Sequence, residues 1–443
     1  ETKGDKMKSQ EMPRLLIISA SNWIENTSSG NTFSNMFNCW DKDKIAMVYT
    51  KSDLPQNDIC YKYFRMSETQ VMKSYFDKNI SIGEEIDLRK LKNDKFLKSD
   101  VAIEDKVKNS SLKKFFYNVL LLGREIMWCC SKWKTKELDD FLNDYRPEVI
   151  FACGYGSAFM NKIERYIIQK SGAKAAFFIG DDWYSLRQIN LSPFFWIMRL
   201  WNRREVRKTV KECDLFYTMA PKVKEQFDKY LKINSKILAK SGTFDKLVQT
   251  ELNKPLKLVY TGNLFCGRWK SLARIARSLE QINKNGKKAE LYIYSIEKLT
   301  NKQKKVLEIE NTSYFMGGIS VQEVKHVQNE ADILVFVEAM DLKDRYISWL
   351  SFSTKIVDYL EKGKCIFAIG WEQSSPIDYL IKNEAAVVAT NRQEISTKLE
   401  MLVNNEKLIS EFGKKAFETG KKNHSKNIVD AKMIEDLRIL GES

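Results

Sequence analysis

Residues 351–370 read S-F-S-T-K-I-V-D-Y-L-E-K-G-K-C-I-F-A-I-G, and they join the start of a helix to a buried strand. Ile356 and Leu360 have the apolar spacing of a short helix, and Gly363 is a typical residue to end it. The apolar run 365–369 that follows has the length of a strand. The segment therefore predicts a helix that leads into a buried strand, the repeating unit of an α/β fold.

The start of this helix carries polar side chains suited to an anion. A helix N-terminus offers free N–H groups and a positive dipole, and Ser353, Thr354 and Lys355 lie at that end. Asp358 could accept hydrogen bonds from two vicinal sugar hydroxyls, as an acid does for ribose in dinucleotide sites. A capped surface helix with a solvated lysine and aspartate fits the same residues, so the segment alone leaves both interpretations open.

Composition limits the class of protein. The chain has 443 residues, of which 43% are hydrophobic and 12% aromatic, and this suits two domains with real cores. The net charge of +15 predicts an anionic partner: a nucleotide, a phospholipid surface or nucleic acid. The apolar stretches are too short to span a bilayer, and the charged first residues predict no signal peptide.

Cysteine and histidine usage narrows the chemistry. The eight cysteines include no C-x-x-C pair, so we expect buried reduced thiols in a cytoplasmic protein rather than a disulfide scaffold or a zinc site. Only two histidines are present, which argues against paired-histidine mechanisms and histidine-rich metal sites. We therefore expect any acid or base to be a carboxylate.

Strands alternate with helices in two series along the chain. In the first half we expect strands at 14–19, 45–49, 147–153, 173–180 and 215–219, with helices at 33–40, 112–133 and from Pro221. In the second half we expect strands at 256–261, 290–295, 312–316, 332–338, 365–369 and 385–389. The helices between them are expected at 272–283, 301–308, 321–329 and 376–382, besides the one in 351–370, and two more helices end the chain. Such alternation predicts parallel sheets.

The stretch 235–255 lacks long apolar periodicity, and we place the joint between two domains there. The predicted organisation is an N-terminal domain at 1–245, a C-terminal domain at 246–422, and a final helix at 423–443 that could cross back to the first domain. The predicted fold class is α/β, with two Rossmann-like, doubly wound domains that face a cleft.

Several segments of the second half resemble one known group of enzymes. They are L-V-Y-T-G-N-L (258–264), Y-F-M-G-G-I-S (314–320), E-A-D-I-L-V-F-V-E (330–338) and the opening segment. In this order they resemble bacterial glycosyltransferases of the GT-B fold, of the retaining, family-four type used in capsule and exopolysaccharide assembly. The first half adds G-N-T after Thr27-Ser28-Ser29, which is similar to the glycine loop after the first strand of that family.

The resemblance implies a site for a nucleotide-sugar donor, with no metal and no other cofactor. The implied donor residues are Gly30, Asn31, Gly262, Asn263, Arg268, Lys270, Gly317, Gly318, Ser353, Thr354, Lys355 and Asp358. Fixed cations and helix dipoles stabilise the charge that grows on a departing diphosphate. Two solvated bases at a helix start and an ordinary glycine turn would fit the same residues.

The chain departs from the family at one position. The family has two acids eight positions apart; Asp358 matches the second, whereas Leu350 stands at the first. Glu338 or Asp341 could replace the missing acid, which lies near the transferred sugar in that family. The identity of the sugar depends on this replacement.

Asp181 and Asp182 end a predicted strand of the first half, where open α/β sheets bind ligands. Two adjacent carboxylates cannot both face one site, so one could act on the acceptor while the other caps the next segment. Together with Glu338 they are the candidate catalytic residues. Trp183 and Tyr155 could stack on an acceptor sugar, and a capping pair with core aromatics fits equally well.

The segment 192–211 predicts a basic amphipathic helix. Its apolar face includes Phe194, Ile197 and Trp201, and its opposite face includes Arg199 and Arg203. Such a helix could lie on an anionic membrane surface. Packing of the apolar face into the first domain, with solvated arginines, is the other interpretation.

Taken together, these features predict a glycosyltransferase in the cytoplasm, which could be peripheral on the inner face of the cell membrane. It would move a sugar from a nucleotide sugar, with UDP favoured, to a glycan or lipid-linked acceptor, retaining configuration and without a nucleic-acid partner. Two alternatives stay open: a nucleotide-sugar epimerase of the same fold, and a non-catalytic basic protein that binds nucleic acid or anionic lipid.

Overall fold

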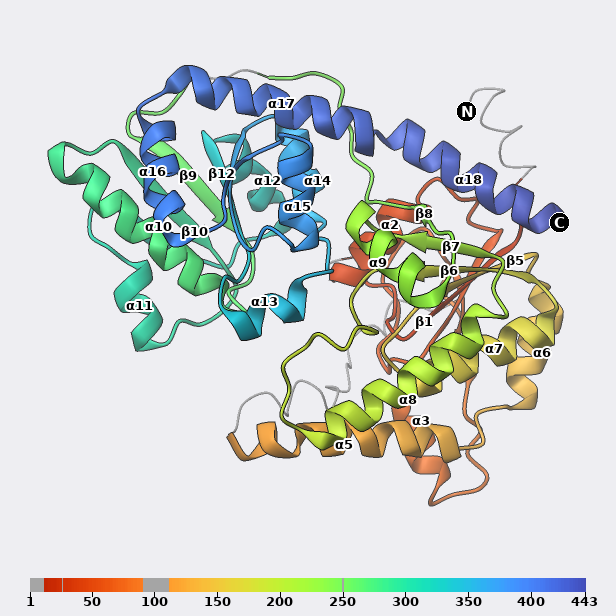
Figure 1. Cartoon of the computed structure of the whole chain (residues 1–443). Coiled ribbons are helices and arrows are strands. Elements are labelled where there is room, and N and C mark those ends of the chain that lie inside the picture. Colours follow the sequence, from red (N-terminus) through yellow and green to blue (C-terminus); the bar gives the residue numbers. More distant parts are fainter. Residues whose placement is uncertain (1–11, 26, 91–110, 249–250) are drawn as a thin grey trace.

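The computed structural model describes residues 12–25, 27–90, 111–248 and 251–443, which form two α/β domains beside each other (Figure 1). The first sheet has eight strands in the order β4-β3-β2-β1-β5-β6-β7-β8, and the second has six in the order β11-β10-β9-β12-β13-β14. Neighbouring strands are parallel in both sheets, apart from the antiparallel pair β3 and β4. The predicted α/β class with two parallel sheets is confirmed.

The strands of the first sheet are β1 (Leu15–Ser19), β2 (Ile45–Tyr49), β3 (Lys62–Arg65), β4 (Glu84–Asp87), β5 (Val149–Cys153), β6 (Lys174–Ile179), β7 (Leu215–Thr218) and β8 (Lys236–Ile237). Those of the second are β9 (Leu256–Thr261), β10 (Ala289–Tyr294), β11 (Ser313–Gly317), β12 (Ile333–Val337), β13 (Cys365–Ile369) and β14 (Val387–Ala389).

The helices up to the joint are α2 (Ser28–Phe37), α3 (Glu68–Ser74), α5 (Ser111–Cys130), α6 (Lys136–Tyr145), α7 (Ala158–Ser171), α8 (Pro193–Val210) and α9 (Pro221–Leu231). Those after it are α10 (Arg268–Ile282), the short 3₁₀ helix η2 (Asn283–Asn285), α11 (Asn301–Leu307), α12 (Val321–Asn329), α13 (Leu342–Ser348), α14 (Lys355–Lys362), α15 (Ser375–Lys382), α16 (Arg392–Val403), α17 (Glu406–His424) and α18 (Lys426–Glu442).

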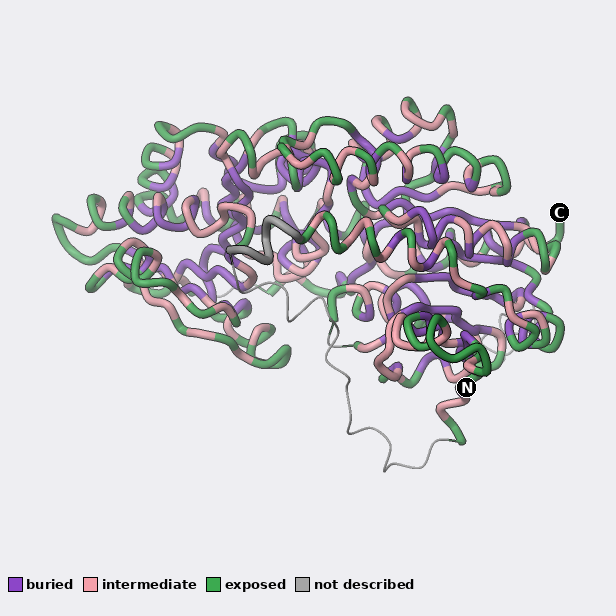
Figure 2. Tube along the Cα trace, turned by 90° about the horizontal axis from the view of Figure 1, so that it is seen from below, coloured by how far each residue is buried: buried purple, intermediate pink, exposed green. Residues whose placement is uncertain are grey.

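The second sheet is covered on both faces. Along β12, Ile333 and Val335 belong to one apolar core, whereas Leu334 and Phe336 belong to the other. Helices α10 and α16 contribute to the first of these cores, and α14 and α15 contribute to the second. Because both faces are buried, the strands are continuous apolar runs rather than alternating ones. Figure 2 shows buried residues along the middle of each domain.

Several predicted strands match the structure to the residue, namely those at 45–49, 256–261 and 365–369. Two predicted helix starts were late. Helix α10 begins at Arg268 because Gly267, with φ +75°, ends the preceding loop in the left-handed region. Helix α2 begins at Ser28, where the Thr27 side chain accepts a hydrogen bond from the Gly30 amide, so the expected glycine loop is the first helical turn.

Two further expectations were incomplete. The chain ends in three helices rather than two, because α17 and α18 are separate helices that meet around Ser425. Residues 51–90 also contain β3, α3 and β4, none of which was predicted from the sequence.

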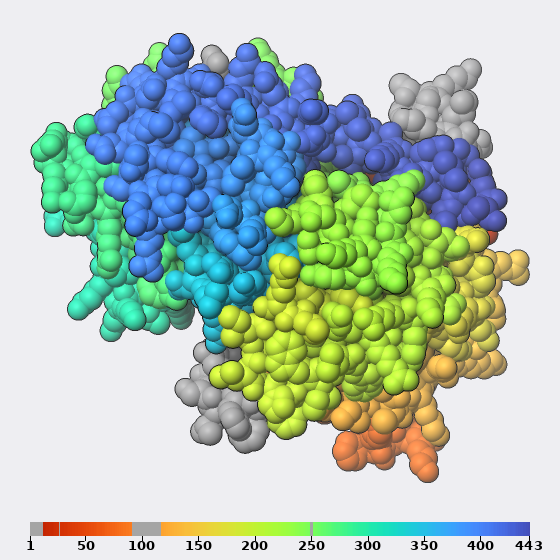
Figure 3. All heavy atoms as spheres, viewed as in Figure 1, coloured from red at the N-terminus to blue at the C-terminus, as the bar shows by residue number. Residues whose placement is uncertain are grey.

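The chain passes between the domains twice, and the two passages are bonded to each other. The first is the segment after β8, and the second is the junction of α17 and α18. The Gly242 amide donates to the His424 carbonyl (2.8 Å), and the Lys426 amide donates to the Gly242 carbonyl (3.0 Å). Beyond this junction α18 packs on the first domain, where Asp436 pairs with Lys236 (2.6 Å). Figure 3 shows the last helices passing over both domains.

Candidate active site

A cavity of about 590 Å³ lies between the domains, at the carboxyl ends of their strands. We call it the cleft cavity. The first domain contributes Ser28, Ser29, Thr32, Phe33, Cys153, Gly154, Tyr155, Phe178, Gly180, Asp181, Trp183 and Met219 to its lining. The second domain contributes Asn263, Arg268, Glu338, Ser351, Phe352, Ser353, Thr354 and Lys355.

Helix α14 presents its N-terminus to the cleft cavity. It buries Ile356 and Leu360 and ends at Gly363, in the left-handed region with φ +60°, as the apolar spacing predicts. Ser353 and Thr354 precede its first turn, and the Thr354 side chain forms no capping bond to the helix. Ser353, Thr354 and Lys355 line the cavity, whereas the Ile356 and Val357 amides of this turn donate to the Ser353 and Thr354 carbonyls. The N-terminal end of a helix at this wall would stabilise an anion.

Lys355 is the cation of this turn, and it lies directly over Gly262. A Cβ atom at Gly262 would lie 1.9 Å from the Lys355 Nζ, and Gly262 has φ +152°. The absence of a side chain at Gly262 thus makes room for the lysine, and the predicted contact of Gly262 with a donor stays a prediction. Burial and the nearby Arg268 lower the pKa of Lys355 to about 8. Lys355 is therefore mostly charged at pH 7, and a bound anion would raise its pKa.

Arg268 is held in place by two acceptors. Its guanidinium donates to the Asn263 Oδ1 (2.6 Å) and to the Glu338 Oε1 (2.8 Å). Glu338 is buried and also accepts from the Ser348 hydroxyl (3.1 Å). Burial disfavours the charged guanidinium, but the ion pair with Glu338 holds the pKa of Arg268 above its ordinary value. The second wall of the cleft cavity thus carries a fixed arginine.

Leu350, at the position of the family's first acid, is fully buried in the apolar core. Of the two acids that could replace it, Glu338 lines the cleft cavity and Asp341 does not. Asp341 instead forms ion pairs with Lys270 and Arg274 on α10. The structure therefore leaves Glu338 as the acid near this part of the cavity.

The two adjacent aspartates of the first domain have different environments. Asp181 is exposed and lines the cleft cavity. Asp182 is buried, accepts from the Ser185 amide (2.8 Å), and accepts from the Trp349 indole of the other domain (2.7 Å). Asp182 caps the following turn and connects the domains, so Asp181 is the aspartate available to a ligand in the cleft.

Tyr155 and Trp183 also line the first-domain wall. The Tyr155 hydroxyl lies 3.0 Å from the Ser21 hydroxyl, and the Trp183 ring packs edge-on against Phe177. A Cβ atom at Gly154 would lie 2.7 Å from the Trp183 ring. The glycine after β5 therefore makes room for Trp183, which the sequence pattern alone did not explain.

Other predicted donor residues lie outside the lining of the cleft cavity. Gly30 packs against the Ile24 carbonyl, where a Cβ atom would lie 1.8 Å from the oxygen, and its neighbour Asn31 likewise lies off the lining. Lys270 pairs with Asp341, and Asp358 pairs with Lys240 (2.5 Å). Gly317, with φ +78°, and Gly318 lie at the end of β11. Their proposed contacts with a donor stay predictions.

Comparison with solved structures identifies the arrangement of the two domains. HepE from Anabaena, solved with UDP, matches with a TM-score of 0.62 at 10% identity, over 96% of this chain and 99% of that chain. Sucrose-phosphate synthase from Thermosynechococcus elongatus matches with a TM-score of 0.60 at 10% identity, over 96% and 98%. The chain has the GT-B fold.

Trehalose-6-phosphate synthase OtsA is a third GT-B match, with a TM-score of 0.57 at 9% identity over 96% of this chain and 99% of that chain. No protein-family model and no curated protein matches the sequence. Among the described residues, no helix is long and apolar enough to cross a membrane. The same residues include no cluster of three or more His, Cys, Asp or Glu able to hold a metal ion.

A second cavity of the GT-B chain, about 650 Å³, lies within the first domain between α5, α8 and the strand ends. It shares Tyr155 and Trp183 with the cleft cavity, so these two side chains lie between the cavities. Its lining includes the buried Glu125, which accepts from the Ala158 amide (2.9 Å) and has a pKa raised by burial. We call it the first-domain cavity.

Helix α8 buries part of the face that was expected to be basic and solvated. Arg199, which was placed on a solvated basic face, is buried, whereas Phe194 and Ile197 are exposed. The reason is that α7 offers α8 a polar surface. The Thr209 hydroxyl donates to the Asn161 side chain (2.9 Å), and Arg165 pairs with the buried Glu205. The prediction that the apolar face of α8 could pack into the domain is therefore wrong for these two residues.

Other exposed apolar side chains lie before α8 and on the neighbouring helix α5. Leu191, Phe194, Ile197 and Leu200 are exposed on and before α8, and Leu120 is exposed on α5, which lies beside it (Figure 1). We call these five residues the apolar α5–α8 surface.

Sequence reasoning missed several residues that fix the site. Trp349 bonds to Asp182 across the cleft, Lys240 pairs with Asp358, and Glu297 accepts from the Leu264 amide (2.6 Å). Each contact joins residues from separate elements, so no local spacing indicated it. Ser28 and Ser29 were noticed only as small polar neighbours of Gly30, although they line the cleft cavity together with Thr32 and Phe33 of the same helix.

Proposed function

We propose that this chain is a glycosyltransferase that transfers a sugar from a UDP-sugar to a glycan or lipid-linked acceptor. The observation that carries the proposal is the pair of cations, Arg268 and Lys355, on one wall of a cavity between two GT-B domains. A departing diphosphate gains negative charge as the glycosidic bond breaks, and cations fixed in position stabilise that charge. The match to HepE, which was solved with UDP and with UDP-glucose, supports the choice of donor.

In this proposal the second domain holds the donor. The hydroxyls and amides before α14 take one phosphate, and Arg268 takes the other. Glu338 keeps Arg268 oriented and lies beside the transferred sugar. Asp358 would leave Lys240 to bind the ribose hydroxyls, and the turn at Gly317 would admit the nucleobase.

The first domain holds the acceptor between the two cavities. Trp183 and Tyr155 would contact the acceptor sugar, and Asp181 would orient its reacting hydroxyl. We propose a retaining, metal-independent transfer, in which the leaving phosphate takes the hydroxyl proton on the same face. A strong protein base is then unnecessary, which agrees with the exposed position of Asp181.

The apolar α5–α8 surface suggests where the acceptor comes from. Phe194 and Ile197 project from the domain beside the first-domain cavity, and Arg204, Arg207 and Lys208 are exposed further along α8. Exposed apolar residues near basic ones suit an anionic membrane surface. We therefore propose a peripheral protein on the inner face of the cell membrane, acting on a lipid-linked acceptor.

Calorimetric titration with UDP tests the donor site. We expect Arg268→Ala to weaken UDP binding by about ten- to a hundredfold, because a charge-assisted hydrogen bond contributes roughly 1.5–3 kcal/mol. Arg277→Ala is the matched control, since Arg277 is an exposed arginine of the same helix outside the cavity. Equal losses in both variants, or no UDP binding by the wild type, would refute the proposal.

Product analysis with UDP-sugars separates transfer from its rivals. Sugar appearing on an added glycan or lipid-linked acceptor supports the proposal, and Asp181→Asn should slow that transfer more than it weakens UDP binding. An epimerised donor without transfer would identify an epimerase. Steeply salt-dependent binding to nucleic acid, without turnover of any donor, would identify a basic binding protein.

A further inference from the structure

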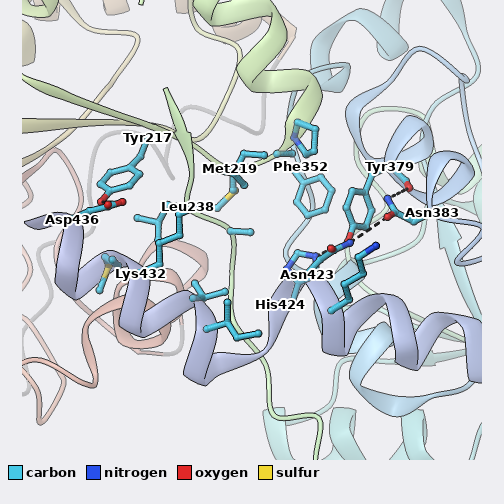
Figure 4. Close-up of a pocket in the computed structure, with 18 residues that line it drawn as sticks. Tyr217, Met219, Leu238, Phe352, Tyr379, Asn383, Asn423, His424, Lys432 and Asp436 are labelled. Carbon is cyan, nitrogen blue, oxygen red and sulfur yellow. Dashed lines mark hydrogen bonds between the residues drawn. The ribbon is translucent and has the colours of Figure 1, made fainter. Parts of the chain in front are cut away.

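A third cavity, about 390 Å³, lies where the two domains and the last two helices meet (Figure 4). We call it the hinge cavity. The first domain contributes Met219 and Leu238, the second contributes Phe352, and α18 contributes Val429 and Met433. Figure 4 shows the side chains of Met219, Leu238 and Phe352 gathered beside the junction of α17 and α18. Its volume is within the range of small-molecule sites, and its walls are mostly apolar.

The buried polar groups of the hinge cavity already have partners. The Tyr379 hydroxyl and the His424 Nε2 are 2.8 Å apart, and the His424 Nδ1 lies 3.0 Å from the Lys240 carbonyl. The Asn423 amide donates to the Tyr379 hydroxyl (3.1 Å). Burial lowers the pKa of His424 to about 4, so His424 is neutral at pH 7. These groups complete the wall and supply no charge to a ligand.

Two lysines place positive charge at the hinge cavity. Lys422 on α17 and Lys432 on α18 both line it and are exposed. Neither has an ion pair or hydrogen bond with the residues that the structure describes. The one carboxylate of the lining, Asp436, is already paired with Lys236 (2.6 Å). An apolar space with two unpaired cations is complementary to a molecule with an apolar body and one anionic group.

The hinge cavity shares a wall with the cleft cavity. Met219 and Phe352 line both, and they come from different domains. Phe352 packs edge-to-face on Tyr379 (5.2 Å between ring centroids) and directly precedes Ser353, the start of the proposed phosphate-binding turn. A molecule in the hinge cavity would contact the same side chains that fix this turn and the angle between the domains.

We propose that the hinge cavity binds a small amphiphile, with an apolar body and one anionic group, and that this ligand holds the two domains in the arrangement that binds the donor. The effect follows from linkage: a ligand that prefers one arrangement of the domains raises its population. Because both walls of the cleft cavity face each other in this arrangement, a hinge ligand favours donor binding. The coupling to UDP rests on the proposed function, whereas binding in the hinge cavity does not.

The test uses the full chain with two probes, anilinonaphthalene sulfonate for an aromatic body and decanoate for an aliphatic one. We expect at least one probe to bind, and Lys422→Glu with Lys432→Glu to weaken it at least tenfold. The matched control is Lys407→Glu with Lys421→Glu, which makes the same change of charge on exposed residues of α17 outside the cavity. Equal binding by both double variants, or no binding of either probe, would overturn the proposal.

Two further measurements address the coupling. Saturating probe should tighten UDP binding about fivefold or more, and saturating UDP should tighten probe binding by the same factor. Probe should also slow amide hydrogen exchange in residues 237–243, a readout that needs no UDP. Slower exchange without UDP binding would refute the proposed function but retain the hinge site. Unchanged exchange together with unchanged or weaker UDP binding would overturn the regulatory role of the hinge cavity.

Discussion

Helices α14 and α8 each border a cavity, but they bury opposite kinds of side chain. The face of α14 that packs on the second sheet is apolar, and Ile356 and Leu360 are fully buried there. The buried face of α8 is mostly polar, and Asn202 and Glu205 meet hydrogen-bonding side chains of α7. Helix α14 therefore satisfies its apolar face inside the domain, whereas α8 leaves Phe194 and Ile197 exposed.

The two helices are held beside their cavities by different kinds of contact. The turn before α14 is fixed by the core beneath it, so the cations near it keep their positions without a ligand. The hydrogen bonds between α8 and α7 also fix the position of α8, because each hydrogen bond has a preferred direction. It does so without using the apolar side chains, which remain available on the apolar α5–α8 surface.

Truncation of the two apolar faces should give the largest contrast. Leu360→Ala on α14 should lower the free energy of unfolding by about 2–5 kcal/mol, because it leaves a cavity in a fully buried site. Ile197→Ala on α8 should change it by less than about 0.5 kcal/mol, because Ile197 is exposed. Urea unfolding of both variants measures the contrast, and an equal loss would show that Ile197 is packed in solution.

A substitution in the polar interface between α8 and α7 should have the next largest effect on stability. Asn161→Leu removes the side-chain partner of both Asn202 and Thr209 while keeping the branched shape and the number of heavy side-chain atoms. We expect a loss of about 1–3 kcal/mol in the free energy of unfolding, because buried polar groups are left without bonds. Thermal unfolding measures it, with exposed Lys170→Leu on the same helix as a control. A neutral Asn161→Leu would show that the polar contacts contribute little to the packing of α8.

The apolar α5–α8 surface should affect membrane binding more than folding. Phe194→Ser with Ile197→Ser should weaken binding to vesicles containing anionic lipid by on the order of tenfold, because less apolar area is buried on contact. The matched control, Met401→Ser with Ile439→Ser, removes exposed apolar residues from other helices. Cosedimentation with vesicles compares them, and equal binding by both double variants would place the membrane contact elsewhere.

The smallest expected effect is a pH dependence of UDP binding, caused by Lys355 on the second-domain wall of the cleft cavity. Lys355 loses its proton as pH rises through about 8, so a bound diphosphate then loses one favourable charge. UDP binding should weaken by up to about tenfold between roughly pH 7 and 9, because the bound state holds the proton more tightly than the free state. Lys355→Arg should flatten the profile, since an arginine stays charged. A wild-type profile that is equally flat would contradict a role for this lysine.

Much of the fold could be predicted because its signals are local. Apolar runs at 45–49, 256–261 and 365–369 are strands in a sheet covered on both faces, and such strands need no knowledge of their neighbours. The helix before 365–369 was equally readable, because its apolar spacing and its final glycine lie within one short segment. Strands and helices alternating in two series were enough to predict two parallel sheets.

The site was predicted less completely because it depends on contacts between distant segments. Sequence order indicated Arg268, Lys355 and Asp181 as members of one cleft, but it gave no sign that Asp182 would bond to Trp349. It also left open which acid replaces the one missing at Leu350. The packing of β12 against α10 places Glu338 beside Arg268, a contact that the spacing along the chain did not indicate.

The sequence by itself determined the two α/β series, the basic character of the chain and the order of its cation-bearing turns, because spacing along one segment encodes each of these. Tertiary structure alone decided which face of α8 is buried, which of two adjacent aspartates reaches the cleft, and that a hinge cavity exists. Each of these depends on what another element presents across a contact. A helix buries whichever face its neighbour can satisfy, and α7 satisfied the polar one.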